Sequence, residues 1–426
     1  MAHFRDRRAF GSVGTRRFRG ARYGDRKSPR FQGLLDLYPG AAAAYSLQAL
    51  SSSWVAGDVV EVRRSSDGSL DSFTQGQIDS GAMLDWVKRP GDFTNVGFET
   101  FANNGTGDGF TATNSAGVGV AKSSAVDGIV TDVVTITFDI DIVSGSPSIS
   151  LRLGGGEPQD LQTITTNGSK SITLTATGAF DNFTFSDGDL PSEFTVSNVR
   201  VSTNDGYVSR LYDQSGFGND ATQAVTTSQP KIVDAGALVA GGLDFDGVDD
   251  GLGSIPNLFS GTSAASSFIV GNADTAGINE AMFSQGANNI LGNAFVITSE
   301  IAFRPGGNTI YNDDFINANP LLLSTIAPAS STSADVSMFL DGSPLGQIST
   351  TSTVLNYGIE GAAIGQNLFN AVFYNGRLKE IIIYPSDQSA NRIGIETNIN
   401  NRYNIFIPLD AWDDSKSWDD SGTWND

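Results

Sequence analysis

The chain lacks cysteine entirely and has a single histidine, His3, among its 426 residues. Without cysteine the fold contains no disulfide, and synthesis in a reducing compartment does no harm. Without a histidine in the body of the chain, Ser-His and Cys-His catalytic pairs are excluded there.

Long apolar runs are also missing. No stretch of about 18 apolar residues exists, so we expect neither a membrane-spanning helix nor membrane insertion. The pairs Arg7-Arg8 and Arg16-Arg17 lie near the start, but no apolar segment follows them, so we expect no export signal. If the protein reaches the outside of a cell, we expect another route, such as lysis.

Positive charge is scarce outside the first 30 residues. Residues 1–30 hold ten Arg or Lys against Asp6 and Asp25, a net charge of +8, while the whole chain carries −21 and the remainder therefore −29. An acidic body repels nucleic acid and anionic surfaces. Nucleic-acid binding is therefore excluded for the body, and only the basic arm retains it.

What the chain has in abundance is glycine, with 49 residues, and 39% hydrophobic residues against 17% charged ones. This composition favours many short strands joined by tight turns. We therefore predict an all-β fold with enough apolar material for packed cores.

The most informative segment spans residues 212–223, from Tyr212-Asp213-Gln214 through Asn219 to Gln223. It has no helical or strand period, and its Gly, Asn and Asp residues suit a loop. It resembles a segment of concanavalin A-like (laminin-G-like) β-sandwich domains. Such domains are common in bacteriophage virion proteins and are distantly similar to the catalytic domain of family 54 arabinofuranosidases.

Three further segments, residues 36–47, 62–68 and 374–385, are similar to other strands of that domain. A short helix is expected within 41–50 and another at about 388–403. The resemblance covers residues 34–86 and 205–408 and implies a concanavalin A-like β-sandwich (jelly roll). The chain opens with a basic anchoring arm at 1–33.

Residues 87–204 interrupt this pattern and have strand signals of their own. Apolar and polar residues alternate over 133–140, 148–153, 171–176 and 194–201. We predict a second β-sandwich, inserted in the first, that resembles a jelly-roll carbohydrate-binding module. Within the host we also predict strands at 58–64, 243–247, 266–271 and 336–342, with a hairpin turn at Asp341-Gly342.

The two ends of the chain are candidates for assembly. The arm interleaves aromatic and basic residues, and we predict that it anchors the protein to other virion proteins of the capsid, portal or tail. Residues 409–426 form an acidic tail with a six-residue repeat, whose tryptophans face one side if the tail is extended. The candidate arm residues are Arg5, Arg7, Arg8, Phe10, Arg16, Arg17, Phe18, Arg19, Arg22 and Tyr23, and the tail residues are Trp412, Trp418 and Trp424.

Carboxylate pairs for glycoside hydrolysis are easy to find among 47 acidic residues. Asp244, Asp246, Asp249 and Asp250 cluster in sequence, as do Asp313-Asp314, but surface turns explain both clusters. Glu280 to Phe283 is only superficially similar to the arabinofuranosidase nucleophile segment. We therefore predict no catalytic residue and no enzyme.

No cofactor is expected. Calcium is a candidate ligand for the turns at 103–109 and 187–189, and Trp54 and Trp86 are candidates for stacking on sugars. A core position for both tryptophans and an ordinary turn for both loops remain the alternatives.

The sequence therefore predicts a bacteriophage virion structural protein of the fibre or capsid-decoration type. Its sandwiches would contact host-surface glycans for attachment. It would be made in the host cytoplasm and assemble into a homo-oligomer, for which a trimer is one candidate. The alternative is a glycan-cleaving hydrolase of arabinofuranosidase type, and a bacterial surface adhesin is a third reading.

Overall fold

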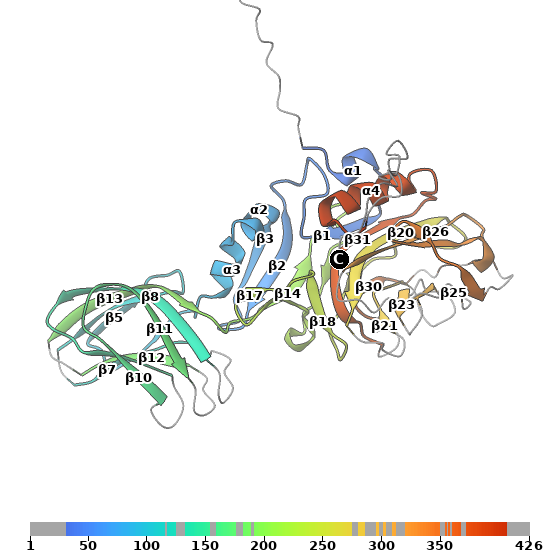
Figure 1. Ribbon diagram of the computed structural model, residues 1–426. Helices are drawn as coiled ribbons and strands as arrows, with labels where there is room; N and C mark the ends of the chain where they lie inside the picture. The colour runs from blue at the N-terminus through green and yellow to red at the C-terminus, as the bar shows by residue number, and fades with distance from the viewer. Residues whose placement is uncertain are drawn as a thin grey trace, which may run out of the picture. The chain divides into compact units, whose positions relative to one another are not determined.

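The computed structural model describes most residues between 31 and 406. Strands make up 48% of it and helices 11%, so the predicted all-β fold is confirmed (Figure 1). The gaps are residue 116 and residues 125–132, 154–158, 176–181, 189–190, 275–279, 286–294, 298–300, 304–308, 312–319, 350–353, 356, 358–359 and 368–371.

The host, which we define as residues 34–86 and 205–408, is built on one 16-stranded antiparallel sheet. Strands from both parts pair directly, since β1 pairs with β31 and β2 pairs with β14. Its strands are β1 (Ala43–Ser46), β2 (Asp58–Arg64), β3 (Leu70–Thr74), β14 (Gly206–Leu211), β15 (Ala221–Thr222), β16 (Lys231–Asp234), β17 (Ala237–Leu238), β18 (Leu243–Asp246), β19 (Leu252–Ile255), β20 (Ala265–Ala273), β22 (Phe283–Gln285), β26 (Leu321–Ala327), β27 (Ser337–Leu340), β28 (Ser343–Pro344), β30 (Ala362–Ile364) and β31 (Asn375–Tyr384).

A smaller host sheet and four α-helices complete this part. The small sheet joins β21 (Glu280–Ala281), β23 (Phe295–Ile297), β24 (Ile301–Phe303), β25 (Thr309–Tyr311) and β29 (Gln347–Ser349). The helices are α1 (Leu34–Leu37), α2 (Gln75–Asp79), α3 (Ala82–Val87) and α4 (Arg392–Tyr403), with short turns η1 (Thr226–Ser228) and η2 (Ser333–Asp335). None of the helices in the described ranges is long and apolar enough to cross a membrane.

The central strands β20 and β26 are buried on both faces, and each face packs a different core. Ile269 and Leu323 point into the main core between the sheet layers. Phe268 and Leu322 point the other way, into a core that α1 and α4 cover (Figure 1). Because neighbouring residues of a strand face opposite sides, burial of both faces favours apolar residues at consecutive positions, as in Phe268-Ile269-Val270 and Leu321-Leu322-Leu323.

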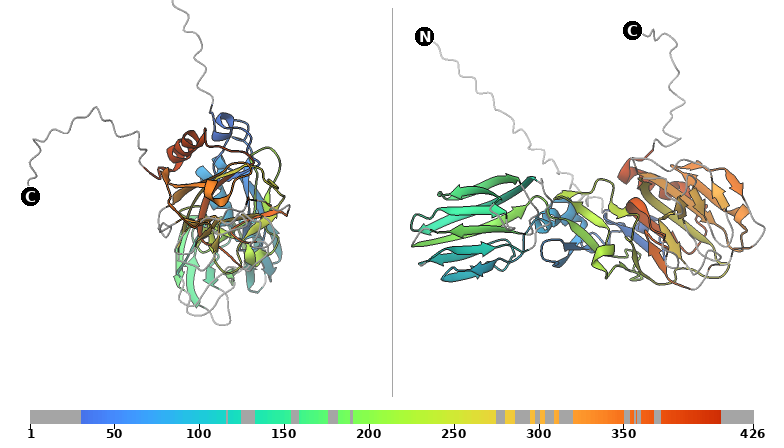
Figure 2. Two further views of the ribbon diagram at one scale, coloured as in Figure 1. Left: turned by 90° about the vertical axis from the view of Figure 1, so that its right-hand side faces the viewer. Right: turned by 90° about the horizontal axis from the view of Figure 1, so that it is seen from below.

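The insert, residues 87–204, forms two five-stranded antiparallel sheets around a separate aromatic core (Figure 2). One sheet, which we call the β9 sheet, joins β10 (Gln159–Ile164), β9 (Ile149–Leu153), β12 (Phe183–Asp187), β7 (Gly119–Lys122) and β4 (Thr94–Val96). The other, the β8 sheet, joins β11 (Gly168–Thr175), β8 (Val133–Ser144), β13 (Ser192–Val201), β6 (Phe110–Asn114) and β5 (Thr100–Asn103).

The predicted strands match closely, and β2 has the predicted bounds. The predicted hairpin is also confirmed, because Leu340 pairs with Ser343 across Asp341-Gly342. Both turn residues have positive φ, 51° and 78°, as a type I′ turn requires. That the insert is an independently folding domain stays a prediction.

The helix predicted within residues 41–50 is wrong, since β1 occupies this segment. The alanines favour a helix in isolation, but two neighbouring segments form hydrogen bonds with the backbone here. β31 pairs along one side, and the loop after β14 bonds to Ala44 through Asp213 and Gln214. Small side chains allow both to come close, so tertiary contacts override local preference.

Candidate functional site

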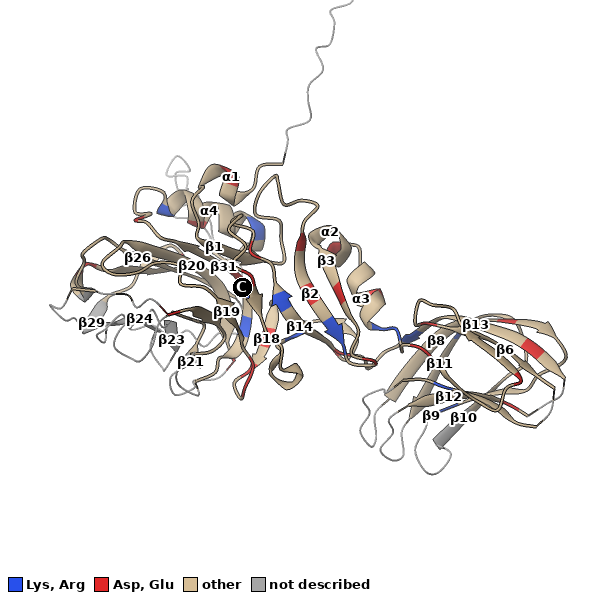
Figure 3. Ribbon diagram, turned by 180° about the vertical axis from the view of Figure 1, so that it is seen from behind, with Lys and Arg blue, Asp and Glu red and all other residues tan. Residues whose placement is uncertain are grey.

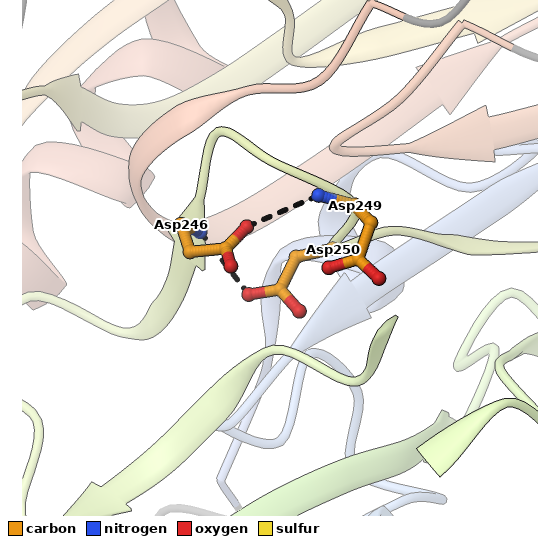
Figure 4. Close-up of side chains that lie close together, drawn as sticks. All are labelled: Asp246, Asp249 and Asp250. Carbon is orange, nitrogen blue, oxygen red and sulfur yellow. Dashed lines mark hydrogen bonds between the residues drawn. The ribbon is translucent and has the colours of Figure 1, made fainter. Parts of the chain in front are cut away.

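Three aspartates gather where β18 ends and turns toward β19. Gly247 takes a left-handed conformation with φ of 75°, which favours glycine and reverses the chain. The Asp246 carboxylate holds this turn, since its Oδ1 accepts from the amides of Val248 at 2.8 Å and Asp249 at 3.3 Å (Figure 4). A turn closed by an aspartate side chain is what the sequence Asp-Gly-Val-Asp favours.

The same turn brings the other two carboxylates beside the first. Asp250 Oδ2 accepts from the Asp246 amide at 3.1 Å, and the Ser228 hydroxyl donates to Asp249 Oδ2 at 3.0 Å. One carboxylate oxygen from each aspartate lies within 4.8 Å of the others. We call these three residues the carboxylate cluster.

The members of the cluster differ in their exposure to water and therefore in acidity. Asp246 is exposed, whereas Asp250 is only 6% exposed. Burial, reinforced by the negative charges of Asp246, Asp249 and Asp244, raises the pKa of Asp250 to about 7. Near neutral pH the cluster therefore combines a buried carboxyl group that can retain its proton, Asp250, with the exposed side chain of Asp246.

Two kinds of chemistry fit such a cluster. Two carboxyl groups of different pKa provide a general acid and an ionised partner, the arrangement that glycoside hydrolysis needs. Three carboxylates within reach of one another also suit a hard cation such as Ca²⁺, which would ionise Asp250 on binding.

Sequence clustering predicted part of this arrangement. Asp246, Asp249 and Asp250 come together, but Asp244 lies apart and pairs with Arg377 at 3.2 Å. Ser228 was not predicted, since it lies in η1 and no local pattern links it to the turn. Asp313 and Asp314 lie outside the described residues, and Glu280 lies on β21.

The segment at 212–223, which carries the resemblance to concanavalin A-like domains, forms hydrogen bonds that hold parts of the host together. The Asp213 carboxylate accepts from the amides of Ala44, Ser215 and Asn219 at 2.9 to 3.0 Å. The Gln214 side chain accepts from the Leu50 amide and donates to the Ser46 and Gln48 carbonyls. Both side chains hold β1 and the loop that follows it. The motif is therefore evidence for the fold.

The two candidate sugar-stacking tryptophans are packed within the host. The Trp54 indole donates to the Asp58 carbonyl at 3.0 Å, and Trp54 packs against the main core. Trp86 contacts Phe73 edge to face, and the Arg64 guanidinium lies over its ring at 4.8 Å. These contacts support the core alternative for both.

The candidate calcium loop at 103–109 is occupied by its own side chains. Asp108 Oδ1 accepts from Thr106 and Asn104, and Oδ2 accepts from Arg200 at 2.8 Å. A guanidinium therefore stands where a cation would bind. In the loop at 187–189, Asp187 is buried and accepts from the Ser192 hydroxyl.

The predicted assembly residues lie outside the described residues. This holds for the arm set (Arg5, Arg7, Arg8, Phe10, Arg16, Arg17, Phe18, Arg19, Arg22 and Tyr23) and for Trp412, Trp418 and Trp424. Their roles stay predictions.

Comparison with known proteins gives distant structural likenesses only. No known family and no curated protein sequence matches the chain. Among solved structures, the Trypanosoma rangeli sialidase with sialic acid is 10% identical, with a TM-score of 0.34, over 73% of this chain and 53% of its own. The chain therefore spans about half the length of that sialidase.

Two further matches have lower TM-scores and cover less of this chain than the sialidase does. A Ruminococcus gnavus sialidase module, CBM40 with α2,3-sialyllactose, is 11% identical over 37% of this chain and 97% of its own, with a TM-score of 0.29. An arabinofuranosidase with arabinofuranosyl-α-1,2-xylobiose is 14% identical over 66% of this chain and 63% of its own, also with a TM-score of 0.29. The similar structures are thus glycan-related proteins with β-sandwich parts.

These matches correct one prediction from the sequence. The chain was predicted not to be an enzyme, but sialidases and an arabinofuranosidase are among the similar structures. The single histidine and the lack of cysteine exclude Ser-His and Cys-His pairs from the body of the chain. They do not exclude chemistry by carboxylates alone. Glycan cleavage is therefore a function to be tested.

Proposed function

We propose that this protein acts on glycans and that the carboxylate cluster cleaves a glycosidic bond. The observation that carries this proposal is the raised pKa of Asp250, about 7, beside carboxylates within 4.8 Å. An acid that keeps its proton near neutral pH can donate it to the leaving oxygen of a glycoside.

The proposed roles follow from exposure and spacing. Asp250 is the general acid, and an ionised neighbour, Asp246 or Asp249, is the nucleophile. Carboxyl oxygens within 4.8 Å of one another leave no room for a water between the base and the anomeric carbon, which favours a retaining double displacement. The ionised carboxylate attacks the anomeric carbon, and the leaving group takes the Asp250 proton as its bond to that carbon breaks. Water then displaces the carboxylate from the anomeric carbon and gives a proton back to Asp250, which releases the sugar.

The test is a panel of chromogenic glycosides and polysaccharides incubated with purified full-length protein. The panel includes arabinofuranosides and sialosides alongside hexosides. We expect turnover on at least one substrate, a loss of about 100-fold or more in Asp250→Asn, and near wild-type turnover in Asp234→Asn, whose exposed carboxyl is not among the charges that raise the pKa of Asp250. No turnover on the panel, or equal turnover in Asp250→Asn, contradicts the proposal.

For the setting of this activity we infer a bacteriophage virion, where the protein reaches host-surface glycans during attachment. The support comes from the sequence, whose basic arm of +8 and acidic Trp-repeat tail suit docking on other virion proteins or a neighbouring subunit. Many copies would multiply weak single-site affinity. Deletion of residues 1–33 should leave the sandwiches folded and abolish incorporation into particles; normal incorporation contradicts this setting.

A further inference from the structure

The outer face of the β9 sheet carries two basic residues in one cross-strand row. Arg152 pairs in register with Thr184, and Thr184 pairs with Lys122. Their neighbours along the strands, Leu151 and Phe185, point into the insert core. Since residues paired directly across antiparallel strands share a face, Arg152, Thr184 and Lys122 all point away from the core.

Neither cation has an acidic partner among the residues that the structure describes. Among the described residues, the arginines that do form ion pairs include Arg64, Arg200, Arg377 and Arg402, but no ion pair involves Arg152 or Lys122. Arg152 Nε is shielded from water and has no hydrogen-bond partner. Other described lysines, such as Lys170, also lack an ion pair, but Arg152 is distinguished by its shielded Nε and by the second cation in its row.

An unpaired and partly buried guanidinium is costly, because it loses hydration without gaining a partner. The two cations lie two strand spacings apart, roughly 10 Å along the row. An anion that reaches between them would supply the missing acceptors, and a carboxylate matches the guanidinium fork.

The rest of this face offers what a sugar chain would contact. Thr94 continues the row, and Ser150 and Ser186 pair in the next row with Val120 and Val96. Hydroxyls suit sugar hydroxyls, and Val96, which is 54% exposed, adds an apolar surface. The described residues of this face are therefore basic, hydroxyl-bearing or apolar, and Figure 3 colours the Lys and Arg positions of the chain blue and the Asp and Glu positions red.

The outer face of the β8 sheet differs. Its threonines bond to one another, as in the pairs Thr135–Thr173 and Thr111–Thr195 at 3.0 Å. Its acid Asp139 accepts from Ser169 and Asn198. This face satisfies its own polar groups and bears negative charge, so it offers nothing to an anion.

We propose that the outer face of β9, β12 and β7 binds an acidic oligosaccharide, with its carboxylate groups held by Arg152 and Lys122. This site rests on the proposal that the protein acts on glycans, but it does not depend on the carboxylate cluster. It would hold an acidic glycan while other parts of the chain act on it.

The test measures binding of full-length protein to oligogalacturonate by calorimetry, with a neutral glucose oligomer of equal length alongside. The variants are Lys122→Gln, Arg152→Gln and both together. Lys170→Gln is the charge-matched control, because Lys170 lies on β11 of the other sheet and bonds only locally. We expect the double variant to bind oligogalacturonate at least about tenfold more weakly, with a weaker salt dependence, and the control to bind within about twofold.

Several results would overturn the site: no preference for the acidic over the neutral oligomer, or equal binding by the double variant. Equal, Arg152-dependent binding of a single-stranded DNA oligomer or a dextran sulfate fragment, neither of which has a carboxylate, would also overturn it, because the site would then select charge and not the carboxylated sugar. Lys122 is exposed, so Lys122→Gln keeps the test valid if Arg152→Gln fails to fold. Asp250→Asn should bind normally, which separates failure of this site from failure of the hydrolase proposal.

Discussion

At the scale of single residues, two buried aspartates show how environment decides what a carboxylate does. Asp213, 1% exposed, is surrounded by donors and holds a loop. Asp250, 6% exposed, is surrounded by other acids, and its pKa rises to about 7. The first residue is therefore a structural anchor and the second a candidate acid.

Replacing Asp213 by alanine should lower the free energy of unfolding by about 3 kcal/mol, because three amides and the Ser215 hydroxyl lose their acceptor. Urea unfolding measures this loss. Phe217→Ala in the same loop is the control, since Phe217 is 71% exposed and should shift stability by less than about 0.5 kcal/mol. A similar loss in both variants would mean that the loop as a whole, and not the Asp213 carboxylate, holds β1.

Asp250→Asn should change stability in a pH-dependent way. The folded pKa of about 7 lies above the ordinary value of 3.8, so the folded state retains a proton that the unfolded state releases. Stability of the wild type therefore falls as pH rises from about 4 to about 7, and the ionised group stays unfavourable above that range.

The variant lacks this charge, so it should be more stable than the wild type by about 1 kcal/mol near pH 8, a value reduced for screening by water around exposed Asp246. Near pH 4, where both side chains are neutral, the two proteins should differ little. Thermal unfolding at both values of pH checks this. A variant that is equally stable or less stable near pH 8 would show that Asp250 is not held protonated.

At the scale of elements, the strands were predictable and their polar attachments were not. The alternation in β8 and β13 gave both strands, and Asp-Gly gave the β27–β28 hairpin. The helix predicted for the alanines of β1 was wrong because β31, with which β1 pairs, lies far away in the sequence. Ser228 beside Asp249 and the unpaired row of Arg152 and Lys122 depend on register and on loop contacts, which periodicity does not encode.

One set of ion pairs links β13 of the insert to helix α3. Arg200 donates to both carboxylate oxygens of Asp85, at 2.6 and 2.8 Å, and to Asp108 at 2.8 Å. Hydrogen bonds from Arg200 lower the pKa of Asp85. Burial alone would raise the pKa of Asp108, but hydrogen bonds from Thr106, Arg200 and Asn104 lower it.

Arg200→Gln should therefore destabilise the protein by about 2 kcal/mol, because it leaves the buried Asp108 with only the longer ion pair to Arg89, at 3.9 Å. The contribution of these pairs is present above about pH 4 and is lost as pH falls through the lowered pKa values, so the variant and wild type should converge in acid. Asp85→Asn is the control, since the Asp85 side chain is 48% exposed and the ion pair between Arg200 and Asp108 remains in this variant. Urea unfolding measures the change, and an equal loss of the free energy of unfolding in both variants would contradict this account.

At the scale of the whole molecule, host and insert have separate apolar cores. The core of the insert draws only on residues from Phe93 to Val201, and among the described strand pairings the insert strands pair only with one another. From the sequence, a boundary is predicted at 87–204, where the resemblance to concanavalin A-like domains is interrupted, and that the insert is a domain stays a prediction. A domain with its own core and closed sheets is expected to fold alone.

Residues 87–204 expressed alone should therefore unfold cooperatively with a dispersed NMR spectrum. Circular dichroism and NMR of the fragment check this. A fragment that binds hydrophobic dyes and lacks a cooperative transition would show that the insert depends on the host.

The central claim, that the carboxylate cluster cleaves glycans, is tested most directly by the pH dependence of hydrolysis on whichever panel substrate is turned over. The account predicts a rate that falls as pH rises through about 7, because Asp250 must carry a proton to act, and a loss of this limb together with most activity in Asp250→Asn. A rate without that limb, or an Asp250→Asn variant with the wild-type rate and profile, would contradict the claim.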